Sequence, residues 1–299
     1  MGESLSMSVR PQRTLRQSVE TTGVGFFTGA DVTLRFHPAA ADHGIAFQRI
    51  DCPGSPPIPA RIDFLVPKHR RTAIARDGVA VELIEHVMAA LAGLQIDNCL
   101  IELNGPEVPG FDGSCRDVCQ LLQTAGISEQ DRPREALALR MPIQVSSSED
   151  DSEIAARPMK RDGLAITYQL DYGERSPIAP QTLTVEIKPE TFVRDIAFAR
   201  TFVLESEVAA LKAAGYGRHL TPQDLVVFGA NGVIGNELRA PDECVRHKIL
   251  DCLGDFALVG CDLHGYVNAY RSGHRQNHEV VRRILLTHDD SHAVHLEAV

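Results

Sequence analysis

Two stretches far apart in the chain share one design: EHVMAALAGLQIDNCLIEL at residues 85–103 and PDECVRHKILDCLGD at residues 241–255. Each contains an apolar-periodic helix that we expect to stop at a glycine, Gly93 or Gly254, because glycine is a common helix terminator. A strand-like run follows each helix, within the first stretch itself and as GYVNAY at residues 265–270 after the second. Two matching helix–strand units predict a duplicated α+β architecture.

The same two helices carry the residue types of a catalytic zinc site. His247 and Asp251 are four residues apart and therefore stand on one helix face, while His86 offers a third ligand. Three protein ligands leave a fourth tetrahedral position for water, which distinguishes catalytic from structural zinc. Glu85, about 100° around the helix from His86, would point past the metal, where a general base belongs. Neither segment alone is specific for a metal site, because a Glu-His dipeptide and a His with an Asp four residues later are both common.

The composition is that of an ordinary soluble globular protein, with 299 residues, 43% hydrophobic and 23% charged. The formal net charge of −10 argues against nucleic acid or an anionic membrane as a partner of the whole surface. It still allows a local basic pocket built from Lys248, Arg246 and Arg271. No apolar run approaches the ~18–20 residues of a transmembrane segment. The seven cysteines form no CxxC motif and fit the reduced thiols of a cytoplasmic protein.

The chain divides into two candidate domains. Residues 1–12 lack the apolar core of a signal peptide and are predicted to be a disordered leader. The first domain covers residues 13–130, with an irregular, Pro-rich and basic insert near residues 52–79. The polar segment 129–135 is predicted to be a linker to the second domain, residues 136–299, which has an insert near residues 201–220.

Within the second domain, the alternating segments 136–145 and 153–157 predict two strands joined by an acidic hairpin tip. Val203, Leu204, Val208 and Leu211 recur at helical spacing. That stripe is either packed in the core or an exposed apolar wall, and the residues alone leave both open. The histidines of the tail look like a metal cluster by composition, but we expect a frayed C-terminus; they are His288, His292 and His295.

Five motifs occur in order along most of the chain. They are EHVMAALAGLQIDNCLIEL (85–103), PGFDGS (109–114), ARTF (199–202), PDECVRHKILDCLGD (241–255) and AYRSGH (269–274). Together, from about Arg13 to Leu286, they resemble the UDP-3-O-acyl-N-acetylglucosamine deacetylase family. The resemblance implies a zinc-dependent amidohydrolase of lipid A biosynthesis. Its reaction removes the N-acetyl group from UDP-3-O-(3-hydroxyacyl)-N-acetylglucosamine and gives UDP-3-O-acyl-glucosamine and acetate.

The resemblance also implies a fold and a setting. Two similar domains, each a β-sheet packed on helices, would form a β-α-α-β sandwich with the active site between them. The insert near residues 201–220 would form a hydrophobic passage for the acyl chain, which favours the apolar-wall interpretation of Val208 and Leu211. The family expectation is a cytoplasmic monomer.

The roles that the resemblance implies fall into three groups. The metal ligands are His86, His247 and Asp251, with Fe²⁺ as an alternative to Zn²⁺. The catalytic groups are Glu85 as general base, Thr201 and Lys248 beside the oxyanion, His274 as the acid for the leaving amine, and Asp255, which orients His274. The substrate-binding residues are Phe202, Val208 and Leu211 for the acyl chain and Arg271 for a phosphate.

Three positions depart from the family pattern, and one of them is Arg271, which stands where the family often has a lysine. Phe27 replaces the usual histidine of the glycine-rich turn at residues 23–29, and Leu83 replaces a threonine or serine two residues before Glu85. These departures keep two alternatives open: a zinc amidohydrolase acting on a different N-acyl sugar nucleotide, and a catalytically silent zinc-binding module. No motif encodes the length of the acyl chain.

Overall fold

The computed structural model describes residues 10–296, with side chains described through residue 288. The elements of the first half are β1 (Pro11–Leu15), β2 (Val19–Val24), β3 (Asp31–Pro38), β4 (Ile45–Arg49), β5 (Ile58–Pro59), the 3₁₀ helix η1 (Ile62–Phe64), β6 (Leu65–Val66), β7 (Ala73–Arg76), β8 (Val79–Glu82), α1 (Glu85–Gly93), β9 (Cys99–Leu103), α2 (Arg116–Ala125) and β10 (Ile127–Pro133).

The second half contains β11 (Ala136–Ala138), β12 (Ile143–Ser147), β13 (Ser152–Arg157), β14 (Leu164–Leu170), β15 (Gln181–Ile187), α3 (Pro189–Asp195), β16 (Phe202–Leu204), α4 (Glu205–Ala213), β17 (Val226–Gly229), β18 (Gly232–Val233), α5 (Glu243–Phe256), the 3₁₀ helix η2 (Ala257–Val259), β19 (Asp262–Tyr270) and α6 (His274–Leu296). Among the described helices, none is long and apolar enough to cross a membrane.

The two large sheets have the same topology. The first has the strand order β2-β3-β9-β4-β5 and the second has the order β12-β13-β19-β14-β15, with β11 added beside β19. In each sheet the strand that follows the central helix, β9 or β19, runs parallel to one neighbour (β4 or β14) and antiparallel to the other (β3 or β13). The predicted duplication of an α+β unit is confirmed.

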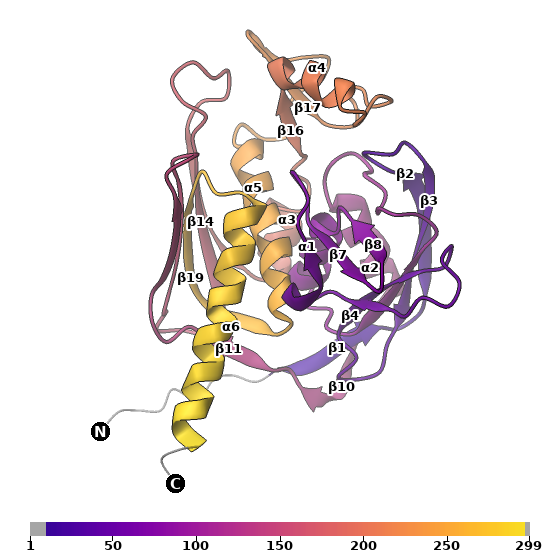
Figure 1. The fold of residues 1–299 in the computed structure, drawn as a ribbon, viewed down its shortest axis with the longest axis vertical. Coiled ribbons are helices and arrows are strands. Elements are labelled where there is room, and N and C mark those ends of the chain that lie inside the picture. Colours follow the sequence, from indigo (N-terminus) through magenta and orange to yellow (C-terminus); the bar gives the residue numbers. More distant parts are fainter. Residues whose placement is uncertain (1–9, 297–299) are drawn as a thin grey trace.

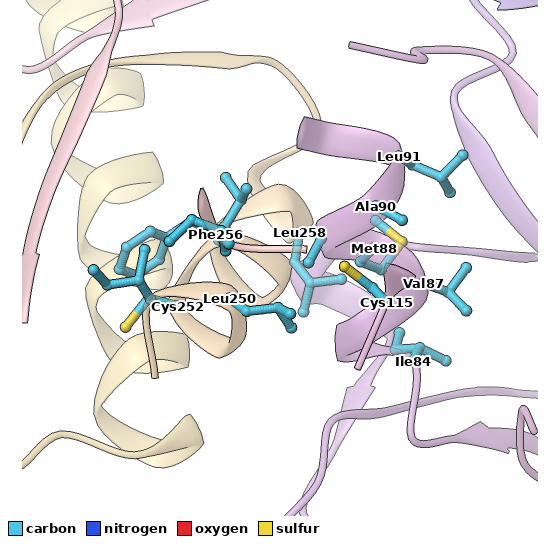
Figure 2. Close-up of a cluster of buried hydrophobic side chains, with 14 of the residues drawn as sticks. Ile84, Val87, Met88, Ala90, Leu91, Cys115, Leu250, Cys252, Phe256 and Leu258 are labelled. Atoms are coloured by element: carbon cyan, nitrogen blue, oxygen red, sulfur yellow. The ribbon is translucent and has the colours of Figure 1, made fainter. Parts of the chain in front are cut away.

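The four layers are sheet, helices, helices and sheet. In Figure 1 the second sheet lies at the left and the first at the right, with α5 and α6 beside the one and α1 and α2 beside the other. Helices α1 and α5 meet in the centre. Figure 2 shows buried apolar side chains around this contact: Leu250 of α5 and Leu258 of η2 lie on the side toward α1, and Val87 points to the opposite side of α1. This is the predicted β-α-α-β sandwich, and the two motif-bearing helices α1 and α5 meet at its central seam.

Gly254 does not terminate its helix. Helix α5 continues to Phe256, and Gly254 faces α1, where a Cβ on it would lie 2.0 Å from the Glu85 carbonyl oxygen. The glycine is therefore required by the close approach of two helix backbones. The expectation that Gly254 stops the helix is wrong because that approach, between residues distant in sequence, is not visible in the local pattern. Gly93, by contrast, is the last residue of α1.

The predicted leader and linker contain a two-stranded sheet. β1 pairs antiparallel with β10, so Pro11 and Gln12 of the predicted leader and most of the predicted linker at 129–135 are strand. Residues 1–9 of the leader lie outside the described part of the chain. The linker prediction failed because β10 is polar between Ile127 and Pro133 and largely exposed, so its strand state depends on backbone pairing with a distant segment.

Other boundaries also differ from prediction. The segment 136–145 is two strands, β11 and β12, interrupted at Pro142, whose ring nitrogen cannot donate a ladder hydrogen bond. The second insert extends beyond residue 220, through β17 and β18 to Val233. The tail is not frayed through residue 296, because α6 continues to Leu296; the side chains of His292 and His295 lie outside the described set.

Candidate active site

The predicted site residues come from three helix segments that meet at the seam. The first turn of α1 carries Glu85 and His86, the middle of α5 carries His247, Lys248 and Asp251, and the first residue of α6 is His274. All six line one cavity of about 920 Å³. Residues from both halves of the chain therefore converge on a single space.

The three predicted metal ligands lie together. One ligand atom from each of His86, His247 and Asp251 falls within 4.8 Å of the others. The Nε2 atoms of His86 and His247 lie 3.6 and 3.4 Å from the same carboxylate oxygen of Asp251. Two imidazole nitrogens and one carboxylate oxygen, with one side open to a cavity, form the donor set that a catalytic divalent cation requires.

Hydrogen bonds fix the form of two of these donors. His247 Nδ1–H donates to the Ala199 carbonyl at 3.1 Å, which leaves Nε2 as the free electron pair. Burial lowers the pKa of His247 to about 4, so the ring is neutral. Asp251 accepts a 2.8 Å bond from Lys248 Nζ. Although burial opposes its charge, Lys248 and His247 hold the Asp251 pKa well below its usual range. Both donors fit a bound cation.

Lys248 is a buried cation tied to Asp251. Burial opposes its charge, but Asp251 outweighs that effect and raises the pKa of Lys248 well above its ordinary value. Lys248 and Asp251 both line the cavity. The structure thus places Lys248 at the site, with its first partner being Asp251.

Glu85 and His274 face each other across the seam. His274 Nε2 lies 4.0 Å from Glu85 Oε1, so a candidate base and a candidate acid are close enough to serve the same reacting centre. Burial raises the pKa of Glu85, with His274 and His86 opposing. His274 Nδ1–H donates to Asp255 Oδ2 at 2.8 Å. Burial opposes the charge of His274, but Asp255 raises its pKa to about 9.

Three residues that the sequence did not single out complete this group. Thr72 and His278 contact Asp255 Oδ1, at 2.5 and 3.2 Å, and Asn277 donates to Oδ2 at 2.8 Å. His278 follows His274 by four residues on one helix face, a spacing that could have revealed it. Nothing in the sequence around Thr72 points to its role. Asp255, His274 and His278 also have the composition of a metal site, but hydrogen bonds already account for their geometry.

The second insert forms the apolar wall of the cavity. Phe202, Val208 and Leu211 line it, together with Thr201 at its inner end. No residue of α4 is buried, so Val208 and Leu211 are not core residues. Val203 and Leu204 belong to strand β16, and the predicted helical stripe is therefore a strand followed by a helix. Phe202 meets the His247 ring edge-on, with centroids 6.2 Å apart, which connects the wall to the ligand cluster.

Two of the predicted basic residues lie away from this cavity. Arg271 lines a smaller neighbouring pocket of about 420 Å³, which Lys248 shares, and its guanidinium pairs with Asp171 and Asp151 at 2.9 and 3.1 Å. Arg246 lines neither pocket and pairs with Asp242 at 2.7 Å. The predicted basic pocket is thus reduced to Lys248 and Arg271.

Two of the three departures from the family pattern, Leu83 and Phe27, reach the main cavity. Leu83 lines it with a backbone φ of +63°, a conformation that is uncommon for a non-glycine residue. Phe27 also lines the cavity, where its ring lies 4.0 Å below the Arg71 guanidinium and meets Tyr216 edge-on at 5.2 Å. Phe27 therefore joins the glycine-rich turn to both inserts through aromatic and cation–π contacts.

Comparisons with known proteins identify one family over most of the chain. The family model described as LpxC: UDP-3-O-acyl N-acetylglycosamine deacetylase matches residues 12–286. The UDP-3-O-acyl-N-acetylglucosamine deacetylase of Myxococcus xanthus (strain DK1622) is 39% identical over 275 residues, which cover 92% of this chain and 86% of that protein. The protein of the same name from Syntrophotalea carbinolica is 39% identical over 279 residues, 93% and 89% of the two chains. That of Bdellovibrio bacteriovorus is 37% identical over 274 residues, 91% and 89%.

The matched region contains both halves of the sandwich and every residue of the candidate site. The matches also cover most of each relative, so they concern whole proteins and not a shared module. The chain therefore belongs to the LpxC family of UDP-3-O-acyl N-acetylglycosamine deacetylases.

Proposed function

We propose that this protein removes the N-acetyl group from UDP-3-O-(3-hydroxyacyl)-N-acetylglucosamine, as a step of lipid A biosynthesis, and that it requires zinc. Family membership supports the reaction class and the substrate. The observation that carries the proposal is the convergence of the His86–His247–Asp251 donor set with Glu85 and His274 at one apolar-walled cavity.

His86, His247 and Asp251 would hold a zinc ion, which would supply Lewis-acid chemistry for amide hydrolysis; the same donors also suit Fe²⁺. Glu85 accepts a proton from the water that attacks the acetyl carbonyl carbon. His274, charged because Asp255 raises its pKa to about 9, donates a proton to the amide nitrogen as the C–N bond breaks. The products are acetate and the free amine.

The remaining residues bind the substrate and exclude water from the site. Lys248 and the Thr201 hydroxyl lie at the cavity, where they stabilise negative charge developing on the acetyl oxygen. Phe202, Val208 and Leu211 provide an apolar surface for the 3-O-acyl chain. Arg271 and Lys248, which share the smaller pocket, provide positive charge for the diphosphate. All seven cysteines are free thiols, which fits action in the reducing cytoplasm.

The test is release of free amine from UDP-3-O-(3-hydroxyacyl)-N-acetylglucosamine by the protein as isolated, after chelation, and after reloading with zinc or iron. UDP-N-acetylglucosamine without the acyl chain is assayed in parallel. We expect activity that disappears with the chelator, returns with the metal, and depends on the acyl chain. Equal turnover of both substrates would point to a different N-acyl sugar nucleotide. Absence of turnover by folded, metal-loaded protein would point to a silent metal-binding module.

A further inference from the structure

Thr72 makes one hydrogen bond to the proposed general base and one to the carboxylate that orients the proposed general acid. It lies immediately before β7, in the insert of the first half, and is completely buried. Its backbone N–H donates to Glu85 Oε2 at 3.0 Å, and its hydroxyl donates to Asp255 Oδ1 at 2.5 Å. A single neutral residue thus contacts both the proposed base and the carboxylate that holds the proposed acid.

The bonding around Asp255 leaves a defined place for the Thr72 hydroxyl. Asp255 Oδ2 accepts from His274 and from Asn277, both at 2.8 Å. The other oxygen, Oδ1, faces Thr72 and His278. Because the Thr72 hydrogen goes to the carboxylate, its oxygen can accept from His278 Nε2–H at 2.9 Å. The carboxylate is held at both oxygens, and its orientation toward His274 depends on donors from two elements.

We propose that Thr72 is a positioning residue for the proposed deacetylation, holding Glu85 and Asp255 in register across the seam between the two halves. The inference rests on the proposed function. Since Thr72 is 0% exposed and does not line the cavity, it acts only through its hydrogen-bond partners. These are Glu85, Asp255 and His278, with His274 Nδ1 also 3.4 Å from the Thr72 hydroxyl oxygen. Glu85 belongs to the first half, and Asp255 and His274 belong to the second. The Thr72–Asp255 bond therefore connects the halves at the point where base and acid must face each other.

The decisive variant is Thr72→Val, which keeps the volume and the backbone N–H but removes the hydroxyl. We expect kcat to fall by about 10–100-fold, as is typical when an outer hydrogen-bond partner of an active site is lost. KM should stay unchanged because Thr72 cannot touch substrate. Thr72→Ser should restore most of the lost kcat. Thr72→Ala removes the same hydroxyl without any added apolar contact, and it replaces the valine variant if that one does not fold.

A matched control separates positioning from stability. Thr14 is also a buried threonine, and its hydroxyl donates to the Asn98 carbonyl at 2.7 Å, far from the site. Thr14→Val should lower the free energy of unfolding without changing kcat per folded, metal-loaded molecule. Thr72→Val should change kcat on that same basis.

The pH profile supplies a readout that a purely structural role would not move. The charged and titratable groups that face His274 are Asp255 and Asp251 from α5, Glu85 from α1 and His278 from its own helix. A carboxylate that loses a hydrogen-bond donor keeps more negative charge for its remaining partner. In Thr72→Val the basic limb of the kcat/KM profile should therefore shift to higher pH.

The outcomes distinguish the two proposals. Absence of deacetylation by the metal-loaded wild-type protein would overturn the proposed function itself. The positioning role alone would be overturned if the wild type is active and both Thr72→Val and Thr72→Ala match it. The match would have to hold for kcat per folded molecule and for the pH of the basic limb. A reduced kcat with a shifted limb, restored by Thr72→Ser, supports it.

Discussion

Gly254 of α5 lies against the backbone of Glu85 in α1, so close that a Cβ on the glycine would stand 2.0 Å from the Glu85 carbonyl oxygen. Gly254 and the Glu85 carbonyl group both belong to helix backbones packed in the core. Neither can move aside as the end of a flexible side chain would. Asp251 and Asp255 flank Gly254 on α5, while Glu85 and His86 begin α1. The contact between these two backbones therefore sets the spacing of the candidate site.

Gly254→Ala should consequently lower the free energy of unfolding by about 1–3 kcal/mol or more, the usual cost of overpacking a core. It should also weaken metal retention, because the elements that carry His86 and Asp251 are forced apart. Urea unfolding and metal analysis measure the two effects. Gly105→Ala is a milder comparison, since its Cβ approaches only a Val32 methyl group, at 3.1 Å. Unchanged stability of Gly254→Ala would contradict this account.

Glu85→Ala should keep its metal and lose activity. Glu85 lies 4.0 Å from His274 and accepts a bond from Thr72, and it is not one of the three clustered donors of the proposed ligand set. Removing a general base typically costs about 10²–10⁴-fold in rate. Metal analysis and kcat/KM check the two halves of this prediction. Glu102→Ala, on β9 and outside the cavity lining, serves as the control. Loss of the metal would show that Glu85 is a ligand.

The sequence could predict part of the clustering of His86, His247 and Asp251 because part of it is local. His247 and Asp251 stand on one face of α5 by their spacing alone, whereas His86 belongs to a motif of the family resemblance. The repeated helix–strand unit predicted the duplication, and the resemblance implied the β-α-α-β layers. A local pattern determines the spacing within one helix, but it does not determine how two helices meet.

The failures concern contacts between segments that the pattern cannot bring together. Thr72 lies 183 residues from Asp255, and nothing around it indicates a hydrogen bond there. Gly254 looked like a helix terminator because its partner, the Glu85 backbone, belongs to the other half. The strand β10 looked like a linker because its pairing partner β1 is more than 100 residues away. Tertiary contact decided the conformation or the role in all three.

The basic limb of the kcat/KM profile should follow the deprotonation of His274. Burial opposes its charge, yet Asp255, with smaller contributions from Glu85 and Asp251, raises its pKa to about 9. Because His274 must hold a proton to donate it, kcat/KM should fall by about tenfold per pH unit above that value. His274→Gln should lower the rate and abolish this limb. If the His274→Gln profile keeps the same basic limb, that limb reports the titration of a group other than His274.

The raised pKa of His274 should also make the free energy of unfolding depend on pH. An unfolded histidine titrates near 6.5, and the folded His274 at about 9, so the folded state binds the proton more tightly. The stabilisation is fully present below pH 6.5 and is lost as the pH rises through about 9. Urea unfolding of metal-free wild type and His274→Gln at pH 6 and at pH 9.5 measures this. The difference between the two proteins should shrink at the higher pH, and a constant difference would refute the linkage.

The apolar wall should select for the acyl chain. Val208 and Leu211 lie on α4, which has no buried residue, and both line the cavity. An aspartate at either position places a charge where the chain binds and forfeits apolar burial worth about 1.5–3 kcal/mol. Val208→Asp and Leu211→Asp should therefore raise KM for the acylated substrate by about 10–100-fold, and leave turnover of a short-chain analogue unchanged. Ile50→Asp, at an exposed apolar position outside the cavity, should affect neither substrate. If both substrates suffer equally in the α4 variants, the helix supports the fold of the insert and does not bind the chain.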